Sequence, residues 1–161
     1  MTVDLILPYV IVAAIAGAGM VTGLLFAFSN FIMRALAELP SEHGVFAMQQ
    51  INKKIINPLF LLFFMVTPLL CLIIATYSLF HLNEPHGALL FIGSLGYITG
   101  PFAITVFCNV PLNNQLAEVT PAEGAAEWSD YQVKWQHWNH IRTYIGLISI
   151  TLLCLGLARG V

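Results

Sequence analysis

The stretch PLFLLFFMVTPLLCLIIATYSLF, residues 58–80, decides the fold class because it contains no Asp, Glu, Lys or Arg. A helix needs about 20 apolar residues to cross the hydrocarbon core of a bilayer, and this stretch supplies them. Residues 5–28 and 88–108 are equally free of charged side chains. The sequence therefore predicts three membrane-spanning helices. Because no basic residue precedes residues 5–28, we expect that stretch to be a permanent helix and not a cleaved secretory signal.

A fourth apolar stretch, residues 144–158, is too short to cross a bilayer alone, since it reaches only about 22 Å as a helix. The spanning helix has to include residues 138–143, which places Asn139 and Arg142 within the edge of the membrane. A straight helix over residues 121–158 would be about 57 Å long, far more than a bilayer requires. We therefore expect an amphipathic segment over about 121–137, which begins at a capping box in Thr120-Pro121-Ala122-Glu123, and a bend near Gly124 or later.

These stretches predict an all-α protein, a bundle of four transmembrane helices with a cytoplasmic extension leading into the fourth. The chain, residues 1–161, then forms a single membrane domain with helices at about 5–33, 58–80, 88–108 and 138–158. Asn57 before Pro58 fits the N-cap and first position of the second helix.

Small residues within the predicted spans indicate how the helices pack. Gly19 with Gly23, and Gly96 with Gly100, are spaced to let neighbouring helices approach closely. Pro101, directly after Gly100, predicts a kink in the third helix.

The composition excludes several classes of protein. Hydrophobic residues make up 58% of the chain and charged residues 9%, with a mean hydropathy of +0.83, which excludes a soluble monomeric domain. Six Lys and Arg against eight Asp and Glu give a formal net charge of -2, so nucleic acid is not an expected partner. Cys71, Cys108 and Cys154 lie in apolar runs without C-x-x-C spacing, and we predict small buried side chains in place of disulfides or a zinc site.

Basic residues near the predicted membrane ends set the expected orientation. The two longer connections and their flanks contain Arg34, Lys53, Lys54, Lys134 and Arg142, whereas the opposite side has only Arg159. We therefore expect a multi-pass protein of the cell or inner membrane, with the longer connections in the cytoplasm and both termini outside.

The most informative pattern is a stripe of aromatic and polar residues before the fourth span. Trp128, Tyr131, Trp135, Trp138, Asn139 and Arg142 fall within an arc of about 100° on a helix, and we call them the tryptophan stripe. An interfacial aromatic belt is one interpretation, because Trp and Tyr favour the headgroup level. An amide and a guanidinium are costly to expose to hydrocarbon, however, which favours a stripe that faces the interior of the bundle.

Amide side chains from other segments are expected on the same side of the membrane. They are Asn30 with Ser29, Asn52, Asn57, Asn109, Asn113 and Asn114. Each one alone is explained by a helix cap or a loop, so only their coincidence suggests a shared site.

The histidines do not join this pattern. His137 and His140 lie on the face opposite the stripe, and His81 and His86 lie on the other side of the membrane. Only His43 remains as a histidine that could reach the stripe. We therefore predict no metal and no cofactor, although a haem-binding or metal-binding redox protein stays an alternative.

Four blocks span nearly the whole chain: GLLFAFS at residues 23–29 with Met33 and Leu36, AMQQIN at 47–52 with Asn57-Pro58, NVPLNNQL at 109–116, and Trp135-x-x-Trp138-Asn139-x-x-Arg142-Thr143. Together they resemble the anthrone-oxygenase-like family, a group of small four-helix membrane proteins. The resemblance implies oxidation of polycyclic anthrones to anthraquinones with molecular oxygen. The family pattern maps onto Asn113, Asn114, Trp135, Trp138, Asn139 and Arg142.

We therefore expect an integral-membrane oxygenase that acts with O2 on a planar apolar molecule. Arg142 and Asn139 would stabilise a developing enolate oxygen, and His43, Tyr131 or a water held by Asn139 are the candidate bases. The predicted substrate-binding residues are Trp135, Trp138, Tyr131, Asn30, Asn109, Asn113 and Asn114. The expected partners are a hydrophobic small molecule, O2 and the lipid bilayer, and a homo-oligomer stays open. A non-catalytic module that binds a lipid or quinone is the other alternative.

Overall fold

The protein is helical throughout the part of the chain that the computed structural model describes, residues 2–160, where five continuous helices and no strand are present. The first helix consists of α1 (Thr2–Ala27), the π-helical turn η1 (Phe28–Ile32) and α2 (Met33–Ala37). Then follow α3 (Ser41–Ile55) and α4 (Pro58–Leu79). The next helix consists of α5 (Gly87–Tyr97), the π-helical segment η2 (Ile98–Asn109) and α6 (Val110–Ala117), and α7 (Ala125–Ala158) is the last.

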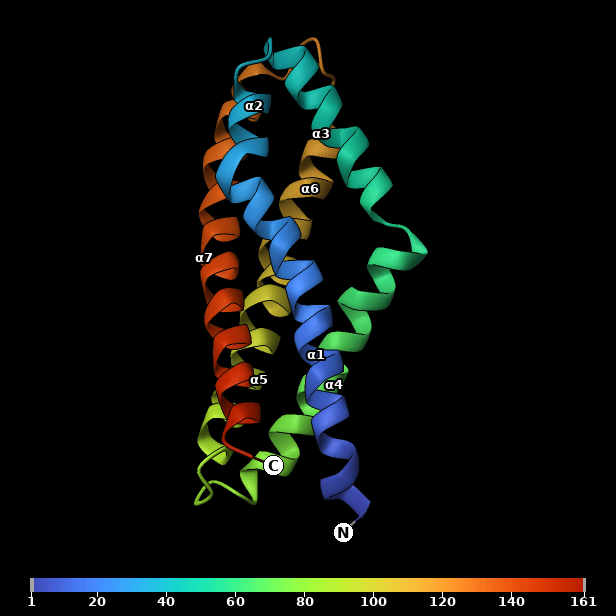
Figure 1. Ribbon diagram of the computed structural model, residues 1–161. Helices are drawn as coiled ribbons and strands as arrows, with labels where there is room; N and C mark the ends of the chain where they lie inside the picture. Colours follow the sequence, from blue (N-terminus) through green and yellow to red (C-terminus); the bar gives the residue numbers. More distant parts are fainter. Residues whose placement is uncertain (1, 161) are drawn as a thin grey trace.

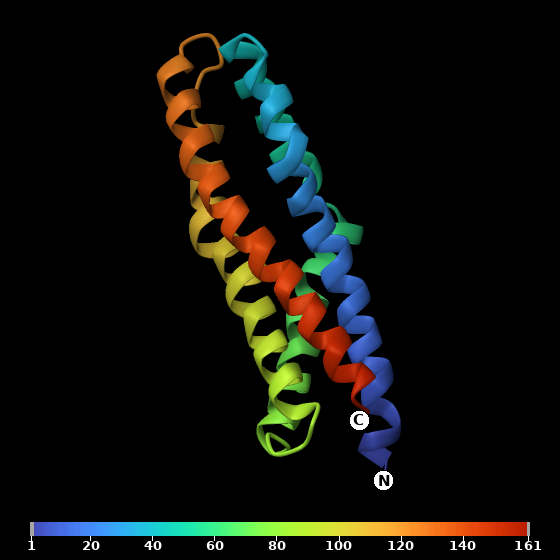
Figure 2. The same ribbon diagram turned by 60° about the vertical axis from the view of Figure 1, so that its left-hand side comes forward.

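Four of these helices are long and apolar enough to cross a membrane: Leu5–Ala37, Pro58–Leu79, Gly87–Ala117 and Ala125–Ala158. They form a bundle in which α1 and α5 each pack against α4 and α7. Both termini lie at the lower end of the bundle in Figure 1, and Figure 2 shows the same arrangement from another side. This confirms the predicted all-α architecture with four candidate spans.

The fourth helix differs from its prediction. Residues 121–123 form a turn, and α7 starts after Gly124 with no side-chain cap, so the capping box is wrong. From Ala125 the helix continues unbroken to Ala158, and the amphipathic segment and the span are one element. The helix continues without a break because no proline or glycine interrupts residues 125–145. Arg142 therefore lies near the midpoint of α7 and not at its end.

The first and third helices run further than predicted, to Ala37 and Ala117, and both pass through π-helical turns. The predicted irregularity at Pro101 takes the form of η2, through which the helix continues. Proline cannot donate a backbone hydrogen bond, and a wider turn relieves its clash with the preceding turn. The predicted N-cap is confirmed, because the Asn57 side chain accepts a bond of 3.1 Å from the backbone N–H of Phe60.

The sequence interpretation missed helix α3 and treated this part of the chain as a connection. Gly44, Val45 and Met48 are buried on its inner face. Their spacing is helical, but the segment is short and polar beside the neighbouring spans. In Figure 1, α3 leans away from the bundle and meets α4 at a corner near Asn57.

Glycine contacts confirm one predicted pair and contradict the other. A Cβ atom on Gly96 would lie 2.6 Å from Ser149 Oγ, and one on Gly100 would collide with Ile145, both on α7. A Cβ atom on Gly19 or Gly23 would meet nothing within 4 Å, so these two mediate no helix contact within residues 2–160. On α1, the buried small residues are instead Ala14, Gly17 and Ala18, which lie on a different face of the helix.

The predicted burial of the cysteines holds only in part. Cys71 is buried, Cys108 is half-buried and Cys154 is exposed, and all three are free. In a bundle that spans a membrane, an exposed thiol on an apolar helix faces lipid, so an apolar run alone does not separate core from lipid-facing positions.

The glycine contacts generate a test of the packing. Gly100→Ala places a methyl group against Ile145, whereas Gly23→Ala places it in open space. Overpacking costs about 1–3 kcal/mol, and alanine is a better helix former than glycine by about 0.5–1 kcal/mol. We expect G100A to lower the melting temperature of the detergent-purified protein by several degrees and G23A to leave it unchanged or slightly higher. Equal melting temperatures would contradict the assigned contact of η2 with α7.

Candidate functional site

Asn139 is the buried centre of a hydrogen-bond network that joins α7 to the first helix. Its side chain is 0% exposed. The amide Nδ2 donates to the backbone oxygen of Leu25 at 3.0 Å and to Ser29 Oγ at 2.7 Å. The amide Oδ1 accepts from Arg142 at both Nε (3.1 Å) and Nη2 (2.8 Å). Asn139 thus fixes the guanidinium relative to α1 and η1.

Arg142 is a buried cation, only 4% exposed. Besides its bonds to Asn139, its Nη1 donates to Thr105 Oγ1 of η2 at 2.7 Å. The guanidinium carbon lies 5.0 Å from the centre of the Trp135 ring, within the range of a cation–π contact. No Asp or Glu within residues 2–160 forms an ion pair with it. Three of the five guanidinium N–H groups are used by these bonds, and two are left for another acceptor.

Trp135 belongs to a ladder of aromatic rings along α7. The Trp128 and Tyr131 rings are 5.7 Å apart and nearly parallel, and the Tyr131 and Trp135 rings are 6.3 Å apart. Asn113 Oδ1 accepts from both Tyr131 Oη (2.9 Å) and Trp135 Nε1 (2.8 Å). Asn109 Nδ2 donates to the Trp135 backbone oxygen at 3.1 Å. Asn113 therefore holds the Trp135 ring, and Asn109 holds its backbone.

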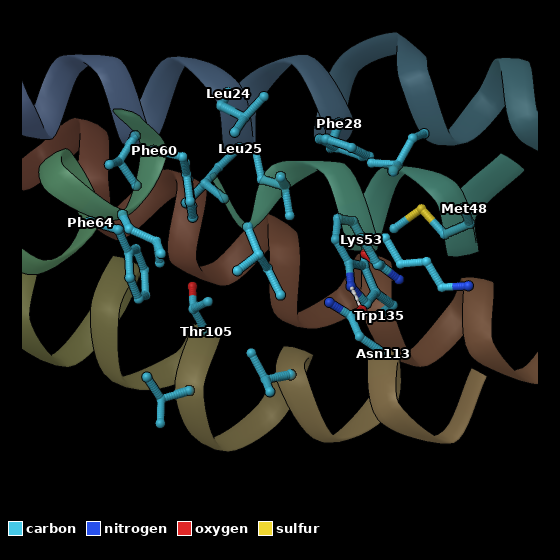
Figure 3. Close-up of a pocket in the computed structure, with 18 of the residues that line it drawn as sticks. Leu24, Leu25, Phe28, Met48, Lys53, Phe60, Phe64, Thr105, Asn113 and Trp135 are labelled. Carbon is cyan, nitrogen blue, oxygen red and sulfur yellow. Dashed lines mark hydrogen bonds between the residues drawn. The ribbon is translucent and has the colours of Figure 1, made fainter. Parts of the chain in front are cut away.

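A cavity of about 460 Å³ opens beside this network. Figure 3 shows its two unlike ends: Phe60 and Phe64 lie at one end, and Asn113 and Trp135 lie at the other. Thr105 lies nearer to the Phe60 and Phe64 end in the view of Figure 3. Arg142 forms part of the wall. Cavities of about 300–1,000 Å³ that are mostly apolar with a few polar groups are typical of small-molecule sites.

The structure brings most of the predicted site residues together. Arg142, Trp135, Asn113 and Asn114 line the cavity. The other members of the group stand behind that wall: Asn139 holds Arg142, Asn109 bonds the Trp135 backbone, and Tyr131 stacks on the Trp135 ring.

Three predicted residues lie elsewhere. Trp138 is only half-buried, because its position lies about 60° from the centre of the buried face of α7. Its ring contacts His137 edge-on. Asn30 is exposed on η1. His43 points outward from α3, with 65% of its side chain exposed and its Nε2 3.4 Å from Glu42. None of the three lines the cavity.

Several lining residues were missed by sequence reasoning. Thr105 binds Arg142 directly, but a single threonine in an apolar run carries no signal of that role. Met48, Gln49 and Lys53 line the cavity from α3, a helix that was not expected. Phe60 looked like an ordinary residue of a span.

The histidines do not gather at the cavity. His140 Nε2 lies 3.3 Å from Gln136 Nε2, and His81 and His86 flank Tyr77 at the opposite end of the bundle. Within residues 2–160, no three His, Cys, Asp or Glu side chains form a group that could hold a metal ion.

Comparison with known proteins identifies the family. The family model for anthrone oxygenase matches residues 59–152, which is more than half of the chain. The matched region covers α4 from Leu59 onward, α5, η2, α6 and most of α7, and with them Thr105, Asn113, Asn139 and Arg142. No curated protein and no solved structure matches the chain. On the strength of the family match, this chain belongs to the anthrone oxygenase family.

Proposed function

We propose that this protein is a membrane-embedded oxygenase that oxidises a planar, apolar, anthrone-like ketone with O2 in the cavity beside Arg142. One observation carries the proposal. Arg142 is a buried cation without a carboxylate partner in the described chain, it has two N–H groups to spare, and it forms part of a cavity wall beside an aromatic face. A buried guanidinium in that setting favours a ligand oxygen that carries negative charge.

The chemistry follows from the acidity of the substrate class. Loss of one CH2 proton from an anthrone gives an enolate conjugated across the rings, and its oxygen would accept hydrogen bonds from Arg142. The enolate gives one electron to O2, and the resulting carbon radical and superoxide combine with a proton to form a carbon hydroperoxide. Loss of water from the hydroperoxide leaves the second carbonyl. Anthrone and O2 thus yield anthraquinone and water, with no external reductant.

The protein would contribute mainly by stabilising the enolate. Of the predicted bases, His43 is exposed and outside the cavity, and the Tyr131 hydroxyl donates to Asn113. The Asn139 amide is engaged by Leu25, Ser29 and Arg142. No histidine or carboxylate lines the cavity in the described chain, so we propose that the proton leaves to water.

The position of the cavity supports an orientation in the membrane. Its polar end points toward the half of the bundle that contains α2 and α3, and the segments on that side of the span α4 carry Arg34, Lys53, Lys54 and Lys134. Because cytoplasmic ends of membrane proteins carry an excess of Lys and Arg, we propose that this end is cytoplasmic and that both termini are outside.

Replacing Arg142 tests the proposed role directly. We expect Arg142→Gln to lower enzyme-dependent O2 uptake with emodin anthrone by about 100-fold or more, because one preorganised donor to an oxyanion contributes about that much. Arg142→Lys should retain part of the rate, since it keeps the charge but not the fork of donors. Arg34→Gln, on an exposed arginine outside the cavity, is the matched control. Binding without turnover in the unmodified protein would identify a lipid- or quinone-binding module instead.

The two tryptophans of the family motif should behave differently. Trp135→Leu removes the aromatic wall of the cavity, and we expect it to raise KM for the anthrone about 3-fold to 12-fold, as loss of one stacked ring does. Trp135→Phe keeps a ring and should lose less. Trp138 lies outside the cavity, so Trp138→Leu should change KM less than twofold. A larger effect at Trp138 than at Trp135 would contradict the assigned wall.

The orientation is testable by labelling of single cysteines in a chain whose three native cysteines are replaced by serine or alanine. Asn83→Cys lies in the exposed turn between α4 and α5, and Lys54→Cys lies in the last turn of α3, beside the other end of the span α4. We expect a membrane-impermeant maleimide to label Asn83→Cys in intact cells and to label Lys54→Cys only after lysis. The reverse pattern would invert the proposed topology.

A further inference from the structure

The charged residues that line the cavity are both cations. They are Lys53 and Arg142, and no Asp or Glu is among the lining residues of the described chain. Arg142 has spare donors, and Lys53 takes part in neither of the described ion pairs, which are Glu42 with His43 and Asp130 with Lys134. Two positive charges around a mostly apolar space raise the local potential, which favours an occupant that is itself an anion.

Lys53 reaches the cavity because of its position on α3. It lies in the last turn of that helix, and Figure 3 shows it at the same end as Asn113 and Trp135. Lys54, the next residue, is also exposed but does not line the cavity. The two lysines share a charge, a helix turn and a depth along the bundle, so they differ mainly in which one faces the site.

The mouth of the cavity lies on the side of the bundle, between the corner of α3 with α4 and helix α6. The lining residues that are also exposed mark it: Lys53, Ile56, Leu61, Met65, Val110, Asn114 and Ala117. Most of this rim is apolar, with Ile56 68% exposed, whereas Lys53 and Asn114 are polar. A rim of this kind suits an amphiphile that enters from the bilayer and keeps one charged group at the polar side.

We infer that the cavity selects a substrate with two acidic oxygens: the enolate that forms at Arg142, and a carboxylate or ionised phenol on the ring system that pairs with Lys53. This inference rests on the proposed function and narrows its substrate class from planar apolar ketones to ring acids. Lys53 is then a specificity residue. It contributes to affinity and orientation, whereas Arg142 acts at the reacting oxygen.

Binding of two matched ligands tests the assignment. Quenching of tryptophan fluorescence measures the affinity of anthraquinone and of anthraquinone-2-carboxylate for the full chain in phosphatidylcholine nanodiscs. We expect the unmodified protein to bind the carboxylate about 10-fold more tightly than the neutral quinone. Lys53→Gln should remove that preference and leave anthraquinone binding within twofold. Lys53→Arg should keep the preference, and Lys54→Gln should behave like the unmodified protein.

Each other outcome has a distinct meaning. The role of Lys53 would be overturned if Lys53→Gln and Lys54→Gln lost the same affinity for the carboxylate, or if the unmodified protein did not prefer the carboxylate. The proposed oxygenase would remain intact in either case if anthrone oxidation persists. Failure of both quinones to bind would overturn the proposed function itself. Oleate serves as a competitor. If oleate displaces the ring acid with equal affinity, and this depends on Lys53, the anion site stands. The choice of a ring acid over a lipid-derived acid as its ligand would then be overturned.

Discussion

The buried guanidinium of Arg142 is the constraint on which the rest of the structure depends. An arginine inside an apolar bundle is costly unless its donors are satisfied and its charge is balanced. Asn139 supplies one acceptor atom for two of its N–H groups, and Thr105 supplies another. Asn139 in turn bonds Leu25 and Ser29 of the first helix. One cation thereby ties the first, third and fourth spans together.

The same network leaves one side of the bundle open. The first helix, η2 and α7 are joined by buried polar bonds at Asn139 and Thr105, so their separation is fixed at that depth. Helix α3 instead leans outward and meets α4 at a corner. The cavity occupies the space between these joined elements and the helices α3 and α4, and Arg142 lies on the side of the joined elements. Positioned donors facing an apolar space from a rigid wall are the arrangement that favours stabilisation of a developing negative charge.

Sequence reasoning predicts the features of this structure that long, regular sequence patterns encode. Uncharged runs locate three spans, and a shorter run extended over residues 138–143 locates the fourth. The 3.6-residue period places Asn139 and Arg142 on the interior face of α7. Sequence reasoning fails where the element is short or where a residue's role depends on a contact with a distant segment. Helix α3 is a short amphipathic element between long apolar ones, and the role of Thr105 exists only because η2 packs against α7. Trp138 lies on the margin of the predicted arc, where a period alone cannot distinguish a cavity from the bundle surface.

The family model covers only part of the cavity wall. The residues inside and outside the matched region are assigned different proposed roles. Arg142, which would act on the reacting oxygen, and Thr105, which accepts a hydrogen bond from it, lie within residues 59–152. Met48 and Lys53 lie before that region, on a helix that contributes to the rim and the polar end. A shared region that supplies the chemistry and most of the entrance, together with a lysine contributed to the rim from outside that region, would let related chains keep one reaction while they accept different ring systems. Under the proposed role of Lys53, α3 would be the element that expresses substrate choice, and Lys53 would be its charged contact with the site.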